Sequence, residues 1–339
     1  ETEDAARRAI ADLVGADPRG VVLGPGSAVL LRRLANAVSE TWMLGDEIVV
    51  SRLDDVANVA PWLRNASRKG VGVRWAEIDI ETCELPEWQF DELLTGAVRV
   101  VALTAASRHV GTRLDVARIA ERTRENGALL VVDLTAAAPF GPQDLTALGA
   151  DVVVLDAAAW GGPQLGALVF RAPALLDRLG SYALEPAPRG PHRLELGPHS
   201  FPQLAGLVAS VEHLAGLDDA ATGTRRERLL TSMAQVQAYQ AELLATLLVE
   251  LSIGTRAVVL GDPARRVPML SLTHPSVKAP DVVEHLADRG VCAMADPGDQ
   301  GVLAHLGTAE IGGVVRVGLA HYTSAGEVEV LVSALAELR

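Results

Sequence analysis

Short apolar segments alternate with helical stretches through the first half of the chain. The clearest are residues 98–104, VRVVALT, and 128–133, ALLVVD. Their apolar residues are continuous, which is typical of strands in a parallel sheet that is covered on both faces. Apolar residues at helical spacing lie between such segments, for example at 56–67 and 115–125. This order predicts a doubly wound α/β domain with a mostly parallel sheet.

The predicted sheet has seven strands. Because crossovers between parallel strands are right-handed, we expect an active crevice at the carboxyl ends of these strands. The predicted strands are residues 21–23, 47–51, 71–78, 98–104, 128–133, 151–155 and 166–170.

The composition changes after the sheet. Residues 181–201 are rich in proline and lack periodicity, which indicates a long irregular connection packed on a partner or over a site. A long helix is predicted from about 225 to 251, and a smaller α+β unit follows it. Because 339 residues exceed what one hydrophobic core usually holds, we expect two domains. We place the large α/β domain at 1–222 and the small C-terminal α+β domain at 223–339.

Charge and cysteine usage narrow the class of protein. The net charge of −13 argues against a nucleic-acid partner, which would require clustered Lys and Arg. Two cysteines, Cys83 and Cys292, cannot form a disulfide framework, so we expect a cytoplasmic location. No apolar run approaches the length of a membrane span, so we expect no membrane partner. We also expect no metal, and an N-terminal segment preceding Glu1, because the numbering does not begin with methionine.

A glycine-rich turn, LGPGSA at 23–28, joins the first strand to a helix. Such a turn offers free backbone N–H groups and the positive end of a helix to a phosphate. As a dinucleotide fingerprint it is weak, because Val29 stands at the third glycine position and Pro25 lacks an N–H. A helix N-cap made by Ser27 needs no ligand, and we favour that interpretation.

Two further features lie at strand ends. Asp133 closes an apolar strand, and a buried unpaired charge is costly, so this carboxylate requires a cation. Alternatively, Asp133 is an N-cap or turn residue for the segment that follows the strand. Residues 151–170 predict two strands joined by Ala157-Ala158-Ala159-Trp160, which a simple hairpin would also explain.

Five segments resemble, in order, the class V aminotransferase or cysteine desulfurase family, a fold-type I group built around pyridoxal phosphate (PLP). Residues 51–62 resemble its S-x-x-E-H-H-A-N-x-x-P-W segment, and 104–111 are similar to its T-H-V-S-N-x-x-G loop. Residues 133–136 resemble D-G-A-Q, and 156–163 resemble S-G-H-K-x-x-G-P. Residues 315–319 look like the segment with an arginine for the substrate carboxylate. The resemblance implies a fold-type I PLP-transferase-like architecture.

The resemblance also implies site residues. Asp133 falls where an aspartate pairs with the pyridine nitrogen, Gly26, Ser27 and Ala28 fall at the phosphate, and Arg316 falls at the substrate carboxylate. Many other positions of the implied cofactor pocket depart from the family. The departures are Asp55 for the stacking histidine, Arg108 for an asparagine, Ala136 for a glutamine, Asp156 for a phosphate-binding serine, Ala158 for a histidine and Ala159 for the Schiff-base lysine.

The missing lysine removes the ordinary chemistry of this family. A methyl group cannot form an imine or relay a proton, so we place no catalytic residue here. A single engineered change would leave the surrounding pocket intact, so we interpret the degeneration as native. We hypothesise that Arg108 moves into the vacant ring site and pairs with Asp133, a pairing that suits bidentate geometry, and that Trp160 fills volume there.

Three functions stay open. The chain is a silent family member that binds a partner or a small anionic or amino-acid ligand, or an enzyme that holds PLP or its amine form (PMP) noncovalently. The third is an ordinary desulfurase or lyase whose lysine is Lys69 or Lys278, although both are typical of surface positions. The resemblance further implies a homodimer with the site at the subunit interface, where residues 181–201 would lie.

Overall fold

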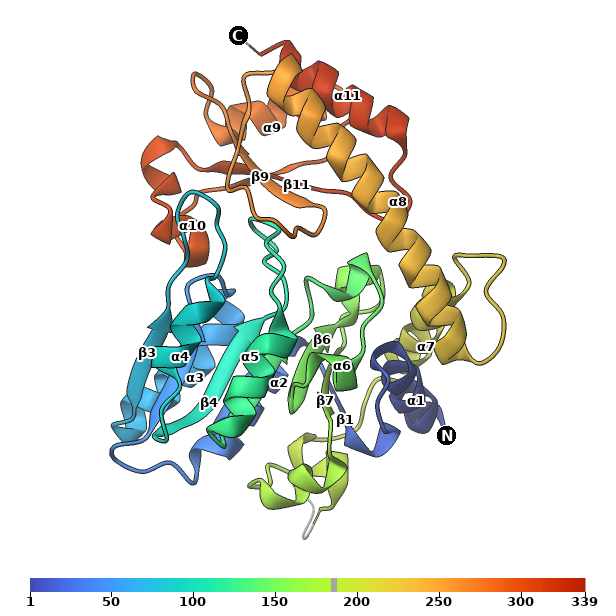
Figure 1. Cartoon of the computed structure of the whole chain (residues 1–339). Helices are drawn as coiled ribbons and strands as arrows, with labels where there is room; N and C mark the ends of the chain where they lie inside the picture. Colours follow the sequence, from blue (N-terminus) through green and yellow to red (C-terminus); the bar gives the residue numbers. More distant parts are fainter. Residues whose placement is uncertain (184–187, 339) are drawn as a thin grey trace.

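The structure, a computed structural model, describes residues 1–183 and 188–338. Its larger part is a seven-stranded sheet, as predicted (Figure 1). The strands are β1 (Val21–Gly24), β2 (Glu47–Ser51), β3 (Gly72–Ala76), β4 (Val98–Thr104), β5 (Leu129–Asp133), β6 (Val152–Asp156) and β7 (Gly166–Phe170). Their order across the sheet is β1-β7-β6-β5-β4-β2-β3. Only β7 runs antiparallel to its neighbours β1 and β6, so the predicted doubly wound, mostly parallel sheet is confirmed.

Helices cover both faces of this sheet, which explains why the strands are apolar at consecutive positions. On β4, Val101 and Leu103 face one core cluster, while Val100 and Ala102 face the other. The first face packs against α1 (Thr2–Val14), α5 (Val116–Glu125), α7 (Phe201–Ala215) and the start of α8 (Arg225–Gly254). The second face packs against α2 (Ser27–Ser39) and α3 (Val56–Lys69). Two further helices, α4 (Phe90–Leu93) and α6 (Leu145–Leu148), are short.

A four-stranded antiparallel sheet forms the smaller part, in the order β10-β11-β9-β8. Its strands share an apolar core with α9 and α11, so the predicted α+β unit is confirmed. The elements are β8 (Val258–Val259), β9 (Met269–Thr273), β10 (Met294–Asp296), β11 (Val314–Gly318), α9 (Ala279–Ala287), α10 (Gly301–His305) and α11 (Ala325–Ala336).

The long helix α8 joins the two parts (Figure 1). Leu229 and Met233, near its start, pack in the core of the large sheet, whereas Leu247 and Leu251 pack in the core of the small one. A boundary between residues 222 and 223 stays a prediction, because this helix belongs to both cores. None of the described helices combines the length and the apolar character needed to cross a bilayer.

Candidate functional site

The carboxyl ends of β4, β5 and β6 meet the start of α2 at two cavities that share lining residues. We call the larger one, of about 570 Å³, the main cavity, and the smaller one, of about 70 Å³ beside Asp133, the inner chamber. The structure brings every site residue predicted from the sequence to one of these two cavities. Those lining residues are Gly26, Ser27, Ala28, Asp55, Arg108, Asp133, Ala136, Asp156, Ala158, Ala159 and Arg316.

The start of α2 is capped by a carboxylate from another strand. Oδ2 of Asp156 accepts a hydrogen bond from the Ser27 backbone N–H at 3.1 Å and one from the Ser27 hydroxyl at 3.3 Å. Its Oδ1 accepts a third from the backbone N–H of Ala158 at 3.2 Å. The prediction that Ser27 is the N-cap is wrong: Gly26 takes that position without a side-chain bond, and Ser27 is the first helical residue. A negative group at this end is favoured by the free N–H groups and the helix dipole.

Close packing of two backbones puts Asp156 in reach of α2. In the β6–β7 register Asp156 is opposite Gly166. A Cβ atom on Gly166 would lie 2.5 Å from both the carbonyl carbon of Gly26 and the backbone nitrogen of Ser27. Because glycine has no such atom, the turn before α2 lies directly against β7 and beside the end of β6.

Asp133 ends β5 with only 8% of its surface exposed. Its Oδ1 accepts a hydrogen bond from the Thr135 backbone N–H at 2.8 Å. Burial raises the pKa of this carboxyl from 3.8 to about 6, although the bonds from Thr135 oppose the shift. The alternative prediction, that Asp133 is an N-cap or turn residue for the segment after β5, agrees with the hydrogen bond from the Thr135 N–H.

Arg108 does not pair with Asp133, so that hypothesis is wrong. Its Nη2 lies 2.7 Å from Oδ2 of Asp55, and its side chain is half exposed at the mouth of the cavities. Asp55 also caps α3, accepting a hydrogen bond from the Ala57 N–H at 2.9 Å. Burial alone would raise the pKa of Asp55, but the neighbouring His109, the hydrogen bond from the Ala57 N–H and the charge of Arg108 lower it to about 2. Asp55 is more exposed than Asp133, so pairing with it leaves the Arg108 guanidinium half exposed and avoids the cost of burying that charge.

Trp160 does not fill the ring site either. Its side chain is 5% exposed and packs in the core cluster beneath α7, where Nε1 donates to the Ser210 hydroxyl at 3.1 Å. The four residues before Gly161 form a 3-10 turn between β6 and β7. This turn directs the methyl groups of Ala158 and Ala159 to the main cavity and the indole to the opposite side.

Arg316, on β11, brings the small domain to the main cavity. Its Nη2 donates to the backbone carbonyl of Arg108 at 3.0 Å, and its Nη1 lies 3.6 Å from Asp296. Its Nε is buried and has no hydrogen-bond partner among the described residues. Burial and the neighbouring Arg108 lower the pKa of Arg316, while Asp296 and Asp55 oppose that shift.

Two titratable side chains of this site escaped prediction from the sequence. His109 is 9% exposed and lies between two carboxylates, with Nε2 at 3.6 Å from Asp55 and Nδ1 at 3.9 Å from Asp296. Asp54 is 2% exposed, accepts a 2.6 Å bond from Asn58, and has its pKa raised to about 8 by burial. In the sequence, the only sign that these two residues belong near the site is that Asp54 precedes Asp55 and His109 follows Arg108.

The two lysines of the chain lie away from the cavities. Lys69 is exposed at the end of α3, and Lys278 is exposed at the start of α9. Neither is among the residues that line the main cavity or the inner chamber. An amine for Schiff-base chemistry is therefore not found at this site among the described residues.

The fold is that of fold-type I PLP proteins. The solved structure of the cysteine desulfurase CsdA from Escherichia coli superposes with a TM-score of 0.85 at 23% identity, over 99% of this chain and 83% of that chain. The family model for aminotransferase class V matches residues 2–331. This chain belongs to the aminotransferase class V family.

Two curated relatives extend over most of the chain. The uncharacterized protein MT3887 of Mycobacterium tuberculosis is 49% identical over 99% of this chain and 84% of its own length. A probable cysteine desulfurase of Pseudomonas putida is 28% identical over 95% of this chain and 79% of its own length. These comparisons confirm the family resemblance that the five sequence segments indicated.

Proposed function

We propose that this chain is a catalytically silent member of its family that binds a small carboxylate ligand in the main cavity. The observation that carries the proposal is the Asp156 carboxylate bonded to the Ser27 N–H at 3.1 Å. The start of α2 can hold a negative group, and the protein itself already supplies that group as the Asp156 carboxylate.

The residues present do not fit a covalently held PLP. A phosphate at the start of α2 would share the Ser27 N–H with Asp156, and two like charges 4 Å apart repel by about 4 kcal/mol at an effective dielectric constant of 20. At the other end of the implied site, Ala159 offers a methyl group where the chemistry needs an amine. Of Asp156, Ala159 and Asp133, only the last, which the resemblance places at the pyridine nitrogen, fits a bound PLP.

Two arginines make the main cavity suitable for a carboxylate. Arg108 and Arg316 both line it, and they come from different domains. Among the described residues the two Nη atoms of Arg316 make one hydrogen bond and one longer ion-pair contact, so N–H groups of this guanidinium remain for a ligand. Planar guanidinium groups bind carboxylates in bidentate fashion. A small carboxylic acid or an amino acid is the ligand class that this chemistry supports.

A second candidate is an enzyme that holds PLP or PMP noncovalently. The observation in its favour is Asp133, a buried carboxylate with a pKa raised to about 6, beside the inner chamber. A cationic pyridinium nitrogen would supply the positive partner that Asp133 lacks.

A PLP titration followed by visible absorbance, with and without borohydride, separates these functions. The silent-member proposal predicts no saturable band. A band that borohydride does not fix to the protein supports the noncovalent alternative. A fixed band would contradict both, because it would require Lys69 or Lys278 to react.

The ligand itself is tested by calorimetric titration with L-alanine and with acetate. We expect saturable binding that Arg316→Gln weakens about 10-fold or more, the value of one charge-assisted contact. The matched control is Arg68→Gln, which removes the same charge from the exposed end of α3. Equal binding by both variants would contradict the assignment of Arg316.

We include a homodimer in this proposal. Leu196 and Phe201, at the end of the proline-rich connection, are 46% and 61% exposed, as expected for side chains that a partner covers. Residues 184–187 of that connection lie outside the described residues. Sedimentation should give a dimer, and Phe201→Glu should shift it toward the monomer; a monomeric unsubstituted protein would contradict this part.

A further inference from the structure

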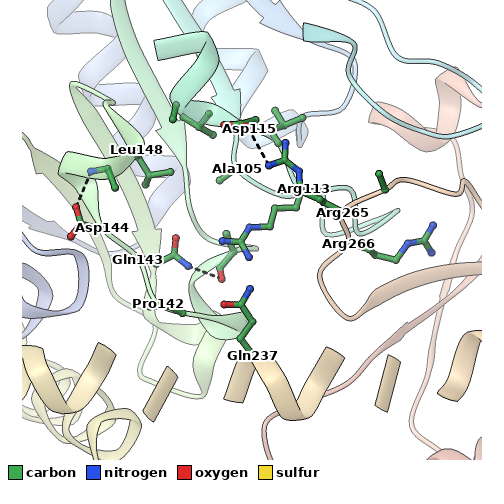
Figure 2. A pocket seen from close by; sticks show the side chains of 16 residues that line it. Ala105, Arg113, Asp115, Pro142, Gln143, Asp144, Leu148, Gln237, Arg265 and Arg266 are labelled. Atoms are coloured by element: carbon green, nitrogen blue, oxygen red, sulfur yellow. Dashed lines mark hydrogen bonds and ion pairs between the residues drawn. The ribbon is translucent and has the colours of Figure 1, made fainter. Parts of the chain in front are cut away.

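A third cavity, which we call the arginine cleft, lies where segments of the large part and of the small part meet. Its volume is about 530 Å³, within the usual range of small-molecule sites. It is bounded by the segment before α5, by residues 142–148, by α8 and by small-domain residues 264–266 (Figure 2). It shares no lining residue with the main cavity or the inner chamber.

Arg113 places an uncompensated positive charge in this cleft. Its side chain is partly buried and has no ion pair or hydrogen bond within the part of the chain that the structure describes. Burial and the neighbouring Arg265 both lower its pKa, and no carboxylate opposes them. Its backbone is held firmly, because the Arg113 N–H donates to the carbonyl of Arg265 at 2.9 Å. Figure 2 shows its guanidinium between Gln143 and Gln237.

Both acidic residues of the cleft are already paired with arginines other than Arg113. Asp115 lies 3.3 Å from Arg265, and Asp144 lies 3.0 Å from Arg226. Arg266, a third arginine of the lining, donates to the Gly261 carbonyl at 2.6 Å and makes no ion pair among the described residues. The cleft is therefore locally positive in a chain whose net charge is −13.

Two amide side chains add directional hydrogen bonding. The side chain of Gln237 makes no hydrogen bond to the described residues, so its NH₂ group can donate to an anion. The NH₂ group of Gln143 is used, donating to the carbonyls of Ala137 at 3.1 Å and Gly141 at 3.0 Å. Its Oε1 accepts nothing from the described residues, so it can receive a ligand hydroxyl.

We propose that the arginine cleft binds a small hydroxylated anion whose carboxylate or phosphate pairs with Arg113 and accepts a hydrogen bond from Gln237. The ligand hydroxyl donates to Gln143. Because Arg113 is anchored to the backbone of Arg265 while Gln237 stands on α8, such a ligand would connect the large domain to the elements that carry the small one.

Calorimetric titration with citrate, and separately with inorganic phosphate, tests this site at constant ionic strength. We expect saturable binding that Arg113→Gln weakens about 10- to 100-fold, the value of a charge-assisted contact. Gln237→Glu, which retains Arg113 but places a carboxylate beside it, should have a similar effect. If citrate binds more tightly than phosphate, the ligand group that pairs with Arg113 is a carboxylate. If phosphate binds more tightly, that group is a phosphate.

Two controls separate this site from others. Arg68→Gln matches the loss of charge on the exposed surface and should bind as the unsubstituted protein does. Because citrate also suits the carboxylate site proposed at Arg316, the titrations are repeated in an Arg316→Gln background, where Arg113→Gln should still weaken binding about 10- to 100-fold. Unchanged binding by Arg113→Gln, or no saturable binding of either probe up to several millimolar, overturns the proposal. The PLP titration has no bearing on these outcomes, so either proposal can fail alone.

Discussion

The carboxylate of Asp156 and the backbone N–H of Ser27 are joined by a 3.1 Å hydrogen bond that links the end of β6 to the start of α2. The two residues are 129 positions apart in the sequence. A helix start with free N–H groups is a ready anion site, and here the anion belongs to the chain. The carboxylate at this one position therefore changes what the main cavity can accept, independently of the methyl group that Ala159 presents there.

The double substitution Asp156→Ser and Ala159→Lys should restore covalent PLP binding. It removes the competing carboxylate and supplies an amine on an exposed position of the main cavity. We expect a saturable visible band that borohydride fixes to the protein, and mass spectrometry should place the label on residue 159.

The single substitution Ala159→Lys is the matched control for that experiment. With Asp156 retained, its affinity for PLP should be lower by about 10-fold or more, because the phosphate still meets a like charge. Equal affinity of the single and double variants would show that Asp156 does not exclude phosphate.

Asp133→Asn should stabilise the protein at neutral pH. The ordinary pKa of the carboxyl is 3.8 and burial raises it to about 6. Between these values the unfolded chain is ionised while the folded one keeps its proton, so stability falls as the pH rises through this window and stays lower above it. The amide imitates the protonated form. Urea unfolding should show a gain of about 1–3 kcal/mol at pH 7.5 and little change below pH 4; a loss at pH 7.5 would contradict the assignment.

The buried pair of Arg7 and Glu195 should dominate stability at the N-terminal end. Two hydrogen bonds of 2.8 and 2.9 Å join them, and Oε1 of Glu195 also accepts from the Leu23 N–H at 2.8 Å. Glu195→Gln leaves the buried guanidinium with only Glu3, at 3.9 Å and partly exposed, as a counter-charge, so unfolding in urea should lose about 3–5 kcal/mol. Breaking the exposed pair of Arg118 and Glu87 with Arg118→Gln should cost at most about 1 kcal/mol.

The same pair should make the protein sensitive to acid. Burial alone would raise the pKa of Glu195, but the neighbouring His199 and hydrogen bonds from Arg7 and Leu23 lower it from 4.5 to about 2. Its contribution is complete above pH 4.5 and is lost as the pH falls toward 2. Urea midpoints measured between pH 5 and pH 2 should therefore decline less steeply in Glu195→Gln than in the unsubstituted protein.

Gly166→Ala should disturb the turn before α2. The added Cβ would lie 2.5 Å from backbone atoms of Gly26 and Ser27, which cannot rotate away. We expect a loss of about 1–3 kcal/mol in urea unfolding, as for other overpacked sites. Gly326→Ala, in the first turn of α11 with no atom near the new methyl, should be neutral or stabilising by up to about 1 kcal/mol.

The architecture could be predicted from the sequence because each strand carries its own evidence. Residues 98–104 are apolar at nearly every position, and such a segment has few stable places other than the middle of a covered sheet. The family resemblance rests on equally local segments, and it is this resemblance that places Asp133, Asp156 and Ala159 at one site. All of them line its cavities.

The pairings at that site were decided by tertiary structure alone. Arg108 could reach more than one carboxylate, and it meets Asp55 because that group is ionised near solvent while Asp133 is buried. Asp156 caps α2 because β7 lies against the Gly26 turn. Apolar patterning determines which segments form the layers, since it depends on neighbours in the chain. The partner of a charged group depends on burial and strand register, which bring distant residues together only in the folded chain.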